Sequence, residues 1–223
     1  MANQKQMSGS ISANLFFVKL GFVGMYLFDA GESLIAFDTG INSKATLAKL
    51  DKLRIVSKRV KHVFLTHSDR DHVGGLAAFP GAKVYLPKAE GAMLDHSTPR
   101  FFGLVYSKPL PVKHELLDDS QVLEIGNALI KCLSTPGHTV GSMSYLINNS
   151  VLVVGDILNL KQGKVVMDRG FMQLNKPKQR ESIQKLSQLK GISLICTAHT
   201  GYTNDFDGAM QDWVAVQPRQ TLP

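Results

Sequence analysis

Apolar stretches in the first half of the chain predict β-strands. They are rich in Val, Ile, Leu and Phe and are separated by short Gly- or Asp-containing turns. The predicted strand regions cover residues 15–20, 25–40, 61–67 and 82–87. Between the second and third, Leu47, Leu50 and Leu53 recur at helical spacing behind Ser43, a suitable N-cap. A strand, helix, strand order is therefore expected, followed by a short helix over residues 88–96.

The second half repeats this alternation and then becomes helical. Strands are predicted over residues 127–135, 142–148, 150–156 and 192–199, and helices over residues 176–190 and 207–216. Residues 97–113 break the pattern with Pro and Gly, which favours a long functional loop. Strands that are grouped and then covered by helices in each half indicate a sandwich of sheets with helices outside.

Composition limits the class of protein. The chain has 223 residues, 44% hydrophobic and 19% charged, which is typical of a single compact domain over residues 1–223. The polar N-terminus lacks the apolar core of a signal peptide, and the later apolar runs are too short to span a bilayer, so a cytoplasmic protein without membrane attachment is expected. Cys132 and Cys196 are predicted to be buried thiols within strands.

The formal net charge of +7 is compatible with an anionic small-molecule substrate or a nucleic acid, or with a role in solubility alone. Lys and Arg are scattered along the chain and form no run of the kind that nucleic-acid-binding tails contain, so a small-molecule substrate is expected rather than a nucleic acid. The sequence does not indicate an oligomeric state.

Histidines and aspartates gather where predicted strands end. The segment "THSDRDHVGG" places four of them within six positions, before a glycine pair, and three more follow later apolar runs. Neutral imidazoles and carboxylates are ligands that zinc, iron and manganese accept, and loops at strand ends can turn several side chains toward one point. The candidate ligands are His67, Asp69, Asp71, His72, His138, Asp156 and His199. Asp71 is also a suitable helix N-cap, and the glycines permit either a close backbone approach or a tight turn.

The order of these motifs resembles the metallo-β-lactamase fold superfamily over nearly the whole chain. "DTG" with Asp38, "THSDRDH", "PGHT", "GD" and "AHTG" carry the resemblance. It implies an α/β fold, a four-layer αβ/βα sandwich, with two divalent metal ions at one edge. By that resemblance His67, residue 69 and His138 hold the first ion, Asp71, His72 and His199 hold the second, and Asp156 bridges them. Asp38 is implied to orient the ligand loop from behind.

Position 69 departs from the superfamily pattern, which has histidine there. An aspartate is shorter and negatively charged, so it would shift the first ion, bind it differently or hold it weakly. Zinc is the first expectation, but the extra carboxylate favours iron or manganese. Three aspartates and a bridging hydroxide would together neutralise two divalent ions.

The resemblance implies hydrolysis by a hydroxide bound between two metals, with Asp71 handling a proton. Asp156 argues against the true β-lactamases, which generally lack it, and "GDIL" is most similar to the thioesterase and lactonase side. The prediction is a hydrolase of a small-molecule ester, thioester or lactone. The alternatives are a phosphodiesterase and a di-iron redox protein, since flavodiiron oxygen reductases also have a carboxylate at this position.

Three segments are expected to line the substrate site. The first holds Phe101, Phe102 and Tyr106 as an apolar wall, with Arg100 and Lys108 available for an anionic group. The others are the early hairpin within residues 15–28 and the segment over residues 165–174.

Overall fold

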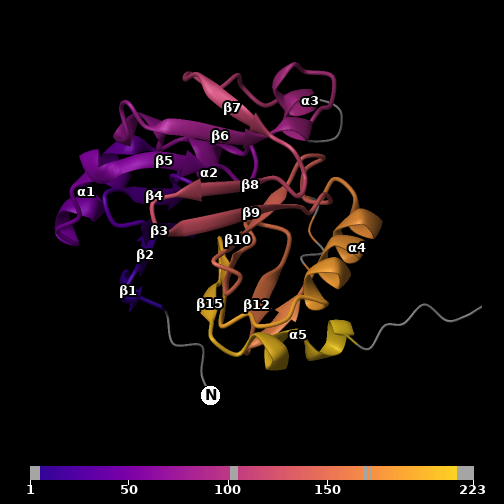
Figure 1. Ribbon diagram of the computed structural model, residues 1–223. Coiled ribbons are helices and arrows are strands. Elements are labelled where there is room, and N and C mark those ends of the chain that lie inside the picture. Colours follow the sequence, from indigo (N-terminus) through magenta and orange to yellow (C-terminus); the bar gives the residue numbers. More distant parts are fainter. Residues whose placement is uncertain (1–5, 101–104, 168–169, 171, 215–223) are drawn as a thin grey trace, which may run out of the picture.

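Two β-sheets form the centre of the molecule (Figure 1). The computed structural model describes residues 6–100, 105–167, 170 and 172–214. The first sheet runs in chain order from β1 to β7, with antiparallel pairing up to β4 and parallel pairing from β4 onward. Its strands are β1 (Gly9–Ser12), β2 (Leu15–Leu20), β3 (Val23–Asp29), β4 (Leu34–Phe37), β5 (Val60–Phe64), β6 (Lys83–Pro87) and β7 (His114–Leu117).

The second sheet has the order β15-β14-β11-β10-β9-β8, in which only β11 and β14 pair in parallel among the described residues. A separate hairpin, β12-β13, lies outside both sheets. These strands are β8 (Val122–Ile125), β9 (Ala128–Ser134), β10 (Met143–Ile147), β11 (Val151–Val153), β12 (Asn159–Lys161), β13 (Lys164–Val166), β14 (Leu194–Thr197) and β15 (Gly201–Thr203).

Helices cover the outer faces. The α-helices are α1 (Ser43–Lys52), α2 (Arg70–Val73), α3 (Gly91–Leu94), α4 (Lys176–Ser187) and α5 (Phe206–Val214). Short 3₁₀ turns are η1 (Ser57–Arg59), η2 (Leu76–Ala78) and η3 (Lys88–Glu90). None of the helices in the described residues is long and apolar enough to cross a membrane.

Three apolar clusters confirm the predicted αβ/βα sandwich. The central cluster contains side chains of both sheets, such as Phe64 and Tyr145, whose rings lie 5.3 Å apart. A second cluster packs Leu50 of α1 on the outer face of the first sheet. A third packs Ile183 of α4 and Met210 of α5 on the outer face of the second sheet. Figure 1 shows α1 on one outer side and α4 with α5 on the other, so the layers run helix, sheet, sheet, helix.

Most predicted elements are present, and the differences have local causes. Helix α1 is capped by Asn42, whose side chain accepts a hydrogen bond from the backbone N–H of Ala45, so the prediction of Ser43 as N-cap was wrong. Both residue types cap well, and the extended backbone falls at Asn42. The short strands β1, β7, β8, β12, β13 and β15 were not predicted. The edge strands β7 and β8 are only four residues long and include charged residues, so neither forms an apolar run like those of the central strands.

Both cysteines are free and buried, as predicted, in β9 and β14.

The ends of the strands carry the candidate ligands. Asp38 follows β4, the "THSDRDH" segment follows β5, Asp156 follows β11 and His199 follows β14. The loop with His138 joins β9 to β10. Because each pair of parallel strands ends at one edge, these segments meet there.

Candidate metal centre

The loop after β5 turns directly into helix α2. The backbone carbonyl of Asp69 accepts hydrogen bonds from the N–H groups of His72 and Val73, at 2.9 and 3.2 Å, so Asp69 occupies the N-cap position. Asp71 lies inside the first turn, and its prediction as N-cap was wrong because the helix begins at Arg70. This start leaves the side chains of Asp71 and His72 on a rigid turn of helix.

The glycine pair provides a close backbone approach. A Cβ atom at Gly74 would lie 2.1 Å from the carbonyl oxygen of Ile41, and one at Gly75 would lie 1.9 Å from that of Thr39. Both distances are far inside van der Waals contact, so only glycine lets α2 pack on the loop after β4. That packing holds the ligand loop against the loop that carries Asp38.

Asp38 orients His72 from behind, as the resemblance implied. It is buried, with φ near 60°, a conformation that aspartate tolerates. Its Oδ2 lies 2.8 Å from Nδ1 of His72, and its Oδ1 accepts the backbone N–H of Thr66 at 2.8 Å. The bond to Nδ1 leaves Nε2 of His72 facing the centre.

Around His72, four predicted ligands form what we call the second half of the centre: Asp71, His72, Asp156 and His199. Nε2 of His72 lies 3.4 Å from Oδ1 of Asp156 and 3.6 Å from Oδ2 of Asp71. Nε2 of His199 lies 2.9 Å from Oδ2 of Asp156, and its Nδ1 lies 3.0 Å from the carbonyl oxygen of Phe22. Both histidines thus turn Nε2 toward the same carboxylates.

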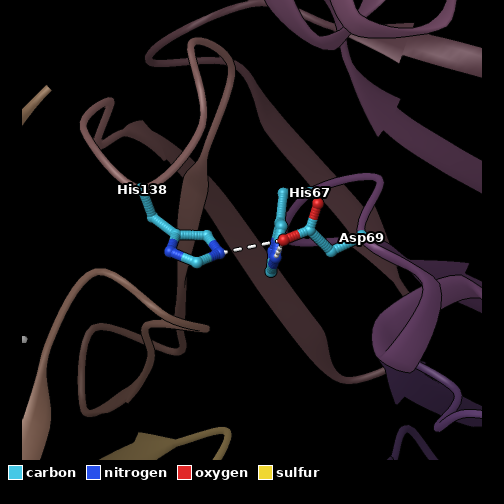
Figure 2. Close-up of side chains that lie close together, drawn as sticks. All are labelled: His67, Asp69 and His138. Carbon is cyan, nitrogen blue, oxygen red and sulfur yellow. Dashed lines mark hydrogen bonds and ion pairs between the residues drawn. The ribbon is translucent and has the colours of Figure 1, made fainter. Parts of the chain in front are cut away.

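The first half consists of His67, Asp69 and His138 (Figure 2). Oδ2 of Asp69 lies 3.5 Å from Nε2 of His67 and 3.1 Å from Nε2 of His138. Nδ1 of His138 lies 3.1 Å from Oε1 of Gln173. The structure therefore brings all seven predicted ligands together, with His138 and Asp156 linking the halves at 3.5 Å. Their coordination of a metal stays a prediction.

A buried arginine joins the first half. The side chain of Arg100 donates from Nε and Nη2 to the carboxylate of Asp69, at 2.6 to 2.9 Å. Nη2 also lies 2.9 Å from Nε2 of His138, and Nη1 donates to the carbonyl oxygen of Met172 at 2.6 Å. We expected Arg100 to face an anionic substrate; it instead pairs with Asp69, because a buried carboxylate needs a compensating cation.

Glu90 is a positioning residue that the sequence did not reveal. Its carboxylate is buried and accepts from the backbone N–H and hydroxyl of Ser68, at 2.8 and 2.5 Å. It also accepts from the hydroxyl of Thr139 and the N–H of Gly141. Ser68 lies between His67 and Asp69, and Thr139 follows His138, so Glu90 fastens the two loops of the first half to each other.

The electrostatics of the centre keep the carboxylates of Asp69 and Asp156 ionised. Burial opposes ionisation of Asp69, yet its contacts with His138, His67 and Arg100 hold its pKa well below the usual range. Burial likewise opposes ionisation of Asp156, but His72 and His199 lower its pKa. Burial lowers the pKa of His138, while the carboxylate of Asp156 outweighs burial and raises the pKa of His199 to about 8.

The residues present fit a divalent metal ion. Buried side-chain atoms without a hydrogen-bond partner in the described part of the chain include Nε2 of His67, Nε2 of His72 and Oδ1 of Asp156. Ligand atoms of these three residues lie within 4.8 Å of one another, as do those of Asp71, His72 and His199. Buried polar atoms are rarely left unbonded, so three that converge on one point indicate a cation-binding site.

Two hollows flank the centre. A cavity of about 630 Å³ is lined by Asp69 and Arg100 together with residues 105–111. A smaller one, about 310 Å³, contacts His199 and Phe22 in the turn between β2 and β3, where the predicted hairpin wall lies. Tyr106 and Lys108 line the larger cavity, and their contact with a substrate stays a prediction. Phe101, Phe102 and part of the 165–174 segment lie outside the described residues.

A four-layer sandwich with a histidine and aspartate centre at the edge of its sheets defines a metal-binding αβ/βα protein. The family model of the metallo-beta-lactamase superfamily matches residues 18–199. The chain therefore belongs to the metallo-β-lactamase superfamily.

Individual relatives agree with this assignment. A probable polyketide biosynthesis zinc-dependent hydrolase of Bacillus subtilis is 39% identical over 41% of this chain and 36% of its own length. A hydroxyacylglutathione hydrolase of Aeromonas hydrophila is 28% identical over 67% of this chain and 52% of its own length. The chain thus spans about half or less of these two relatives.

A solved structure of a metallo-beta-lactamase family protein from Thermus thermophilus superposes with a TM-score of 0.69. It is 23% identical, over 91% of this chain and 79% of that one, and this likeness shows the fold.

Proposed function

We propose that the protein is a metal-dependent hydrolase that cleaves an ester, thioester or lactone of a small molecule. The observation that carries the proposal is the convergence of ligand atoms of His67, His72 and Asp156, unbonded within the described residues, beside the partly exposed Asp71. The names of the two relatives, a zinc-dependent hydrolase and a hydroxyacylglutathione hydrolase, support the same class of reaction.

When bound here, a divalent ion lowers the pKa of a water molecule and polarises the bond to be attacked. The protein's own residues supply the rest. Asp71 keeps 21% of its side chain exposed, and its Oδ2 lies 3.5 Å from Nε2 of His199, so its carboxylate can take a proton at the open side of the centre. Phe22 holds His199 by its carbonyl oxygen and stacks on the imidazole at 5.8 Å, which fixes the ring.

The identity and number of the ions belong to the same proposal. Imidazole and carboxylate donors favour zinc first, with iron or manganese as alternatives. The sequence predicts two ions, and that number stays a prediction. The second half can accept an ion without any movement of Arg100, whereas the first half cannot.

The cavity of about 630 Å³ supports a substrate with an apolar portion. Its lining includes Val73, Leu76 and Leu110, and Lys108 lies at the same wall as a cation for an anionic group. An acyl chain seated there would end near Asp69 and Arg100. This arrangement suits an ester or thioester of an apolar acid.

The di-iron alternative depended on Asp69 as a carboxylate that faces a metal. Both oxygens of Asp69 accept hydrogen bonds from Arg100, which supports the hydrolase over that alternative.

The test is a panel of esters, thioesters, lactones and phosphodiesters, assayed with protein loaded with zinc, manganese or iron. Asp71→Asn should lower kcat by roughly 10²- to 10⁴-fold, the usual contribution of a positioned acid or base. Asp118→Asn is the matched control, because Asp118 is exposed and its carboxylate forms a surface ion pair with Lys88. Turnover confined to the phosphodiesters, or an undiminished kcat in Asp71→Asn, would contradict the proposal.

A further inference from the structure

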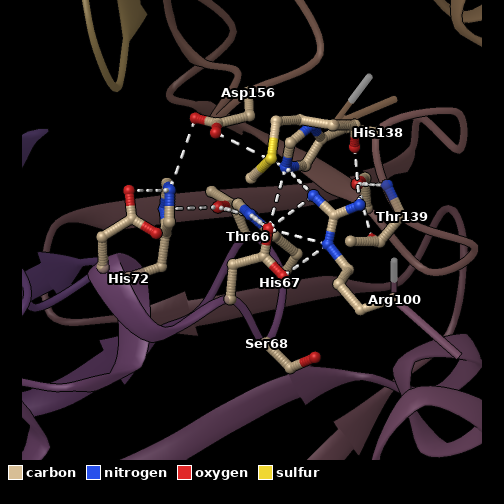
Figure 3. Close-up of polar contacts among 12 residues, drawn as sticks. Thr66, His67, Ser68, His72, Arg100, His138, Thr139 and Asp156 are labelled. Carbon is tan, nitrogen blue, oxygen red and sulfur yellow. Dashed lines mark hydrogen bonds and ion pairs between the residues drawn. The ribbon is translucent and has the colours of Figure 1, made fainter. Parts of the chain in front are cut away.

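The position of Arg100 is unusual for a cation at a metal centre. Arg100 is only 3% exposed, and Figure 3 shows its guanidinium pointing to His138. Two nitrogens of the fork reach the first half: Nε and Nη2 bind Asp69, and Nη2 also binds His138. A two-pronged pair of this kind fixes geometry as well as charge.

The bond to His138 uses the atom that a metal would need. Nε2 of His138 lies 2.9 Å from Nη2 of Arg100 and 3.1 Å from Oδ2 of Asp69. Because a guanidinium nitrogen can only donate, and Nδ1 faces Oε1 of Gln173 at 3.1 Å, we assign the hydrogen to Nδ1 and the lone pair to Nε2. That lone pair accepts a hydrogen bond from Nη2 of Arg100 at 2.9 Å. The same Nη2 donates to Oδ2 of Asp69 at 2.6 Å. An ion bound by Nε2 of His138 would have to displace the guanidinium from that atom, and an ion at Asp69 would lie directly beside the guanidinium charge.

The charges of the aspartates and of Arg100 also oppose an ion in the first half. Asp69, Asp71 and Asp156 supply three negative charges, and Arg100 supplies one positive charge. A single divalent ion then brings these groups to neutrality. A second divalent ion would add two positive charges next to a buried guanidinium, which costs free energy unless an anion enters with it.

The second half shows no such competition within the described residues. The carboxylates of Asp71 and Asp156 face the imidazoles of His72 and His199 there. Nε2 of His72 and Oδ1 of Asp156, both unbonded in the described part of the chain, belong to this half. Nε2 of His67 is also unbonded there, and a ligand atom of His67 lies within 4.8 Å of those of His72 and Asp156, so His67 can reach an ion held by this half. An ion can therefore reach its ligands here without displacing a protein cation.

We propose that Arg100 takes the place of the first metal ion, so that the protein binds a single divalent ion in the second half of the centre. The guanidinium is a permanent part of the site. It neutralises Asp69 and holds Asp69 and His138 in position. Asp69 and Arg100 then act as one charge-compensated pair at the ligand position.

The experiment measures bound metal without any substrate. Metal-free protein is saturated with Zn²⁺, freed of excess by gel filtration, and analysed for zinc per chain, with calorimetric titration as a second readout. The wild type should retain one ion. Arg100→Met should retain two, because it releases His138 and leaves Asp69 in need of a cation. Arg59→Met is the matched control: it removes an exposed arginine that also pairs with an aspartate, Asp29, and should stay at one ion.

If Arg100→Met does not fold, the double variant Asp69→His/Arg100→Met takes its place in the experiment. It removes both buried charges together. It should also retain two ions. Two ions in the wild type, or one ion in every folded variant, would overturn the proposal. Two ions in the double variant but one in a folded Arg100→Met would overturn it as well, because Asp69 alone would then block the first half. Zinc content does not depend on turnover, so absence of hydrolysis would count against the proposed function and leave this result standing.

Discussion

The two halves of the centre are built from adjacent loops, yet they meet their electrostatic needs differently. In the first half, the carboxylate of Asp69 and the imidazole of His138 are already bonded to Arg100. In the second, Nε2 of His72 and Oδ1 of Asp156 are buried and unbonded among the described residues, and in the first half Nε2 of His67 is unbonded as well. On our proposal, ligand-type residues at the right positions do not by themselves define a metal site, because the protein can supply the cation from its own side chains.

The difference between the two halves is tested most directly by removing one histidine from each half. His72→Ala should weaken Zn²⁺ binding by more than about 100-fold, because loss of a residue that only supports a ligand already costs 10- to 100-fold. His138→Ala should weaken it by less than about 10-fold, because Arg100 occupies that ligand's lone pair. Competition with a chelating dye measures both values. Equal losses in the two variants would show that both halves hold metal.

A smaller loss of metal affinity is expected from a change at Asp38, which lies behind His72 of the second half. Asp38→Asn keeps the shape and tolerates the positive φ, but it weakens the hydrogen bond that directs His72. Metal affinity should fall by about 10- to 100-fold. The same dye competition applies, with Asp29→Asn as the matched surface control. An affinity equal to that of the wild type would show that Asp38 has no part in orienting His72.

A substitution in the first half should lower the stability of the fold instead of the affinity for metal. Glu90→Gln replaces an acceptor of four N–H and O–H donors by an amide that can accept on one atom only. The free energy of unfolding should fall by about 1 to 3 kcal/mol, as measured by urea denaturation. Glu115→Gln alters only a surface ion pair with Lys83 and should cause no measurable change. A Glu90→Gln variant as stable as the wild type would mean that other contacts hold the two loops of the first half together.

The smallest effect concerns the core between the sheets. Burial raises the pKa of Cys132 to about 12, and burial also raises the pKa of Cys196. Both thiols should therefore stay protonated and unreactive to a disulfide reagent at pH 8, with or without EDTA, and both should react in urea. Because the folded pKa lies above that of the unfolded chain, the thiols' contribution to stability is lost as pH rises from about 9 toward 12. Rapid labelling after chelation alone would show that the metal holds the core together.

The sequence predicted the sandwich and the convergence of the ligands because both depend on local patterns. Apolar runs define buried strands, and polar residues at strand ends meet where the strands end. Arg100 and Glu90 could not be placed in this way. Arg100 lies 31 residues from Asp69 in a stretch with Pro and Gly nearby, and Glu90 stands beside a short helix where a glutamate usually faces water. Only the tertiary packing shows that both are buried and paired.

The bond between Phe22 and His199 joins residues 177 positions apart in the chain. Next to it, the N–H of Gly24 donates to the carbonyl oxygen of Ala198. Since a nascent chain leaves the ribosome from its N-terminus, Phe22 has no access to His199 until 177 further residues have been made. The second half therefore cannot be completed before residue 199 has left the ribosome.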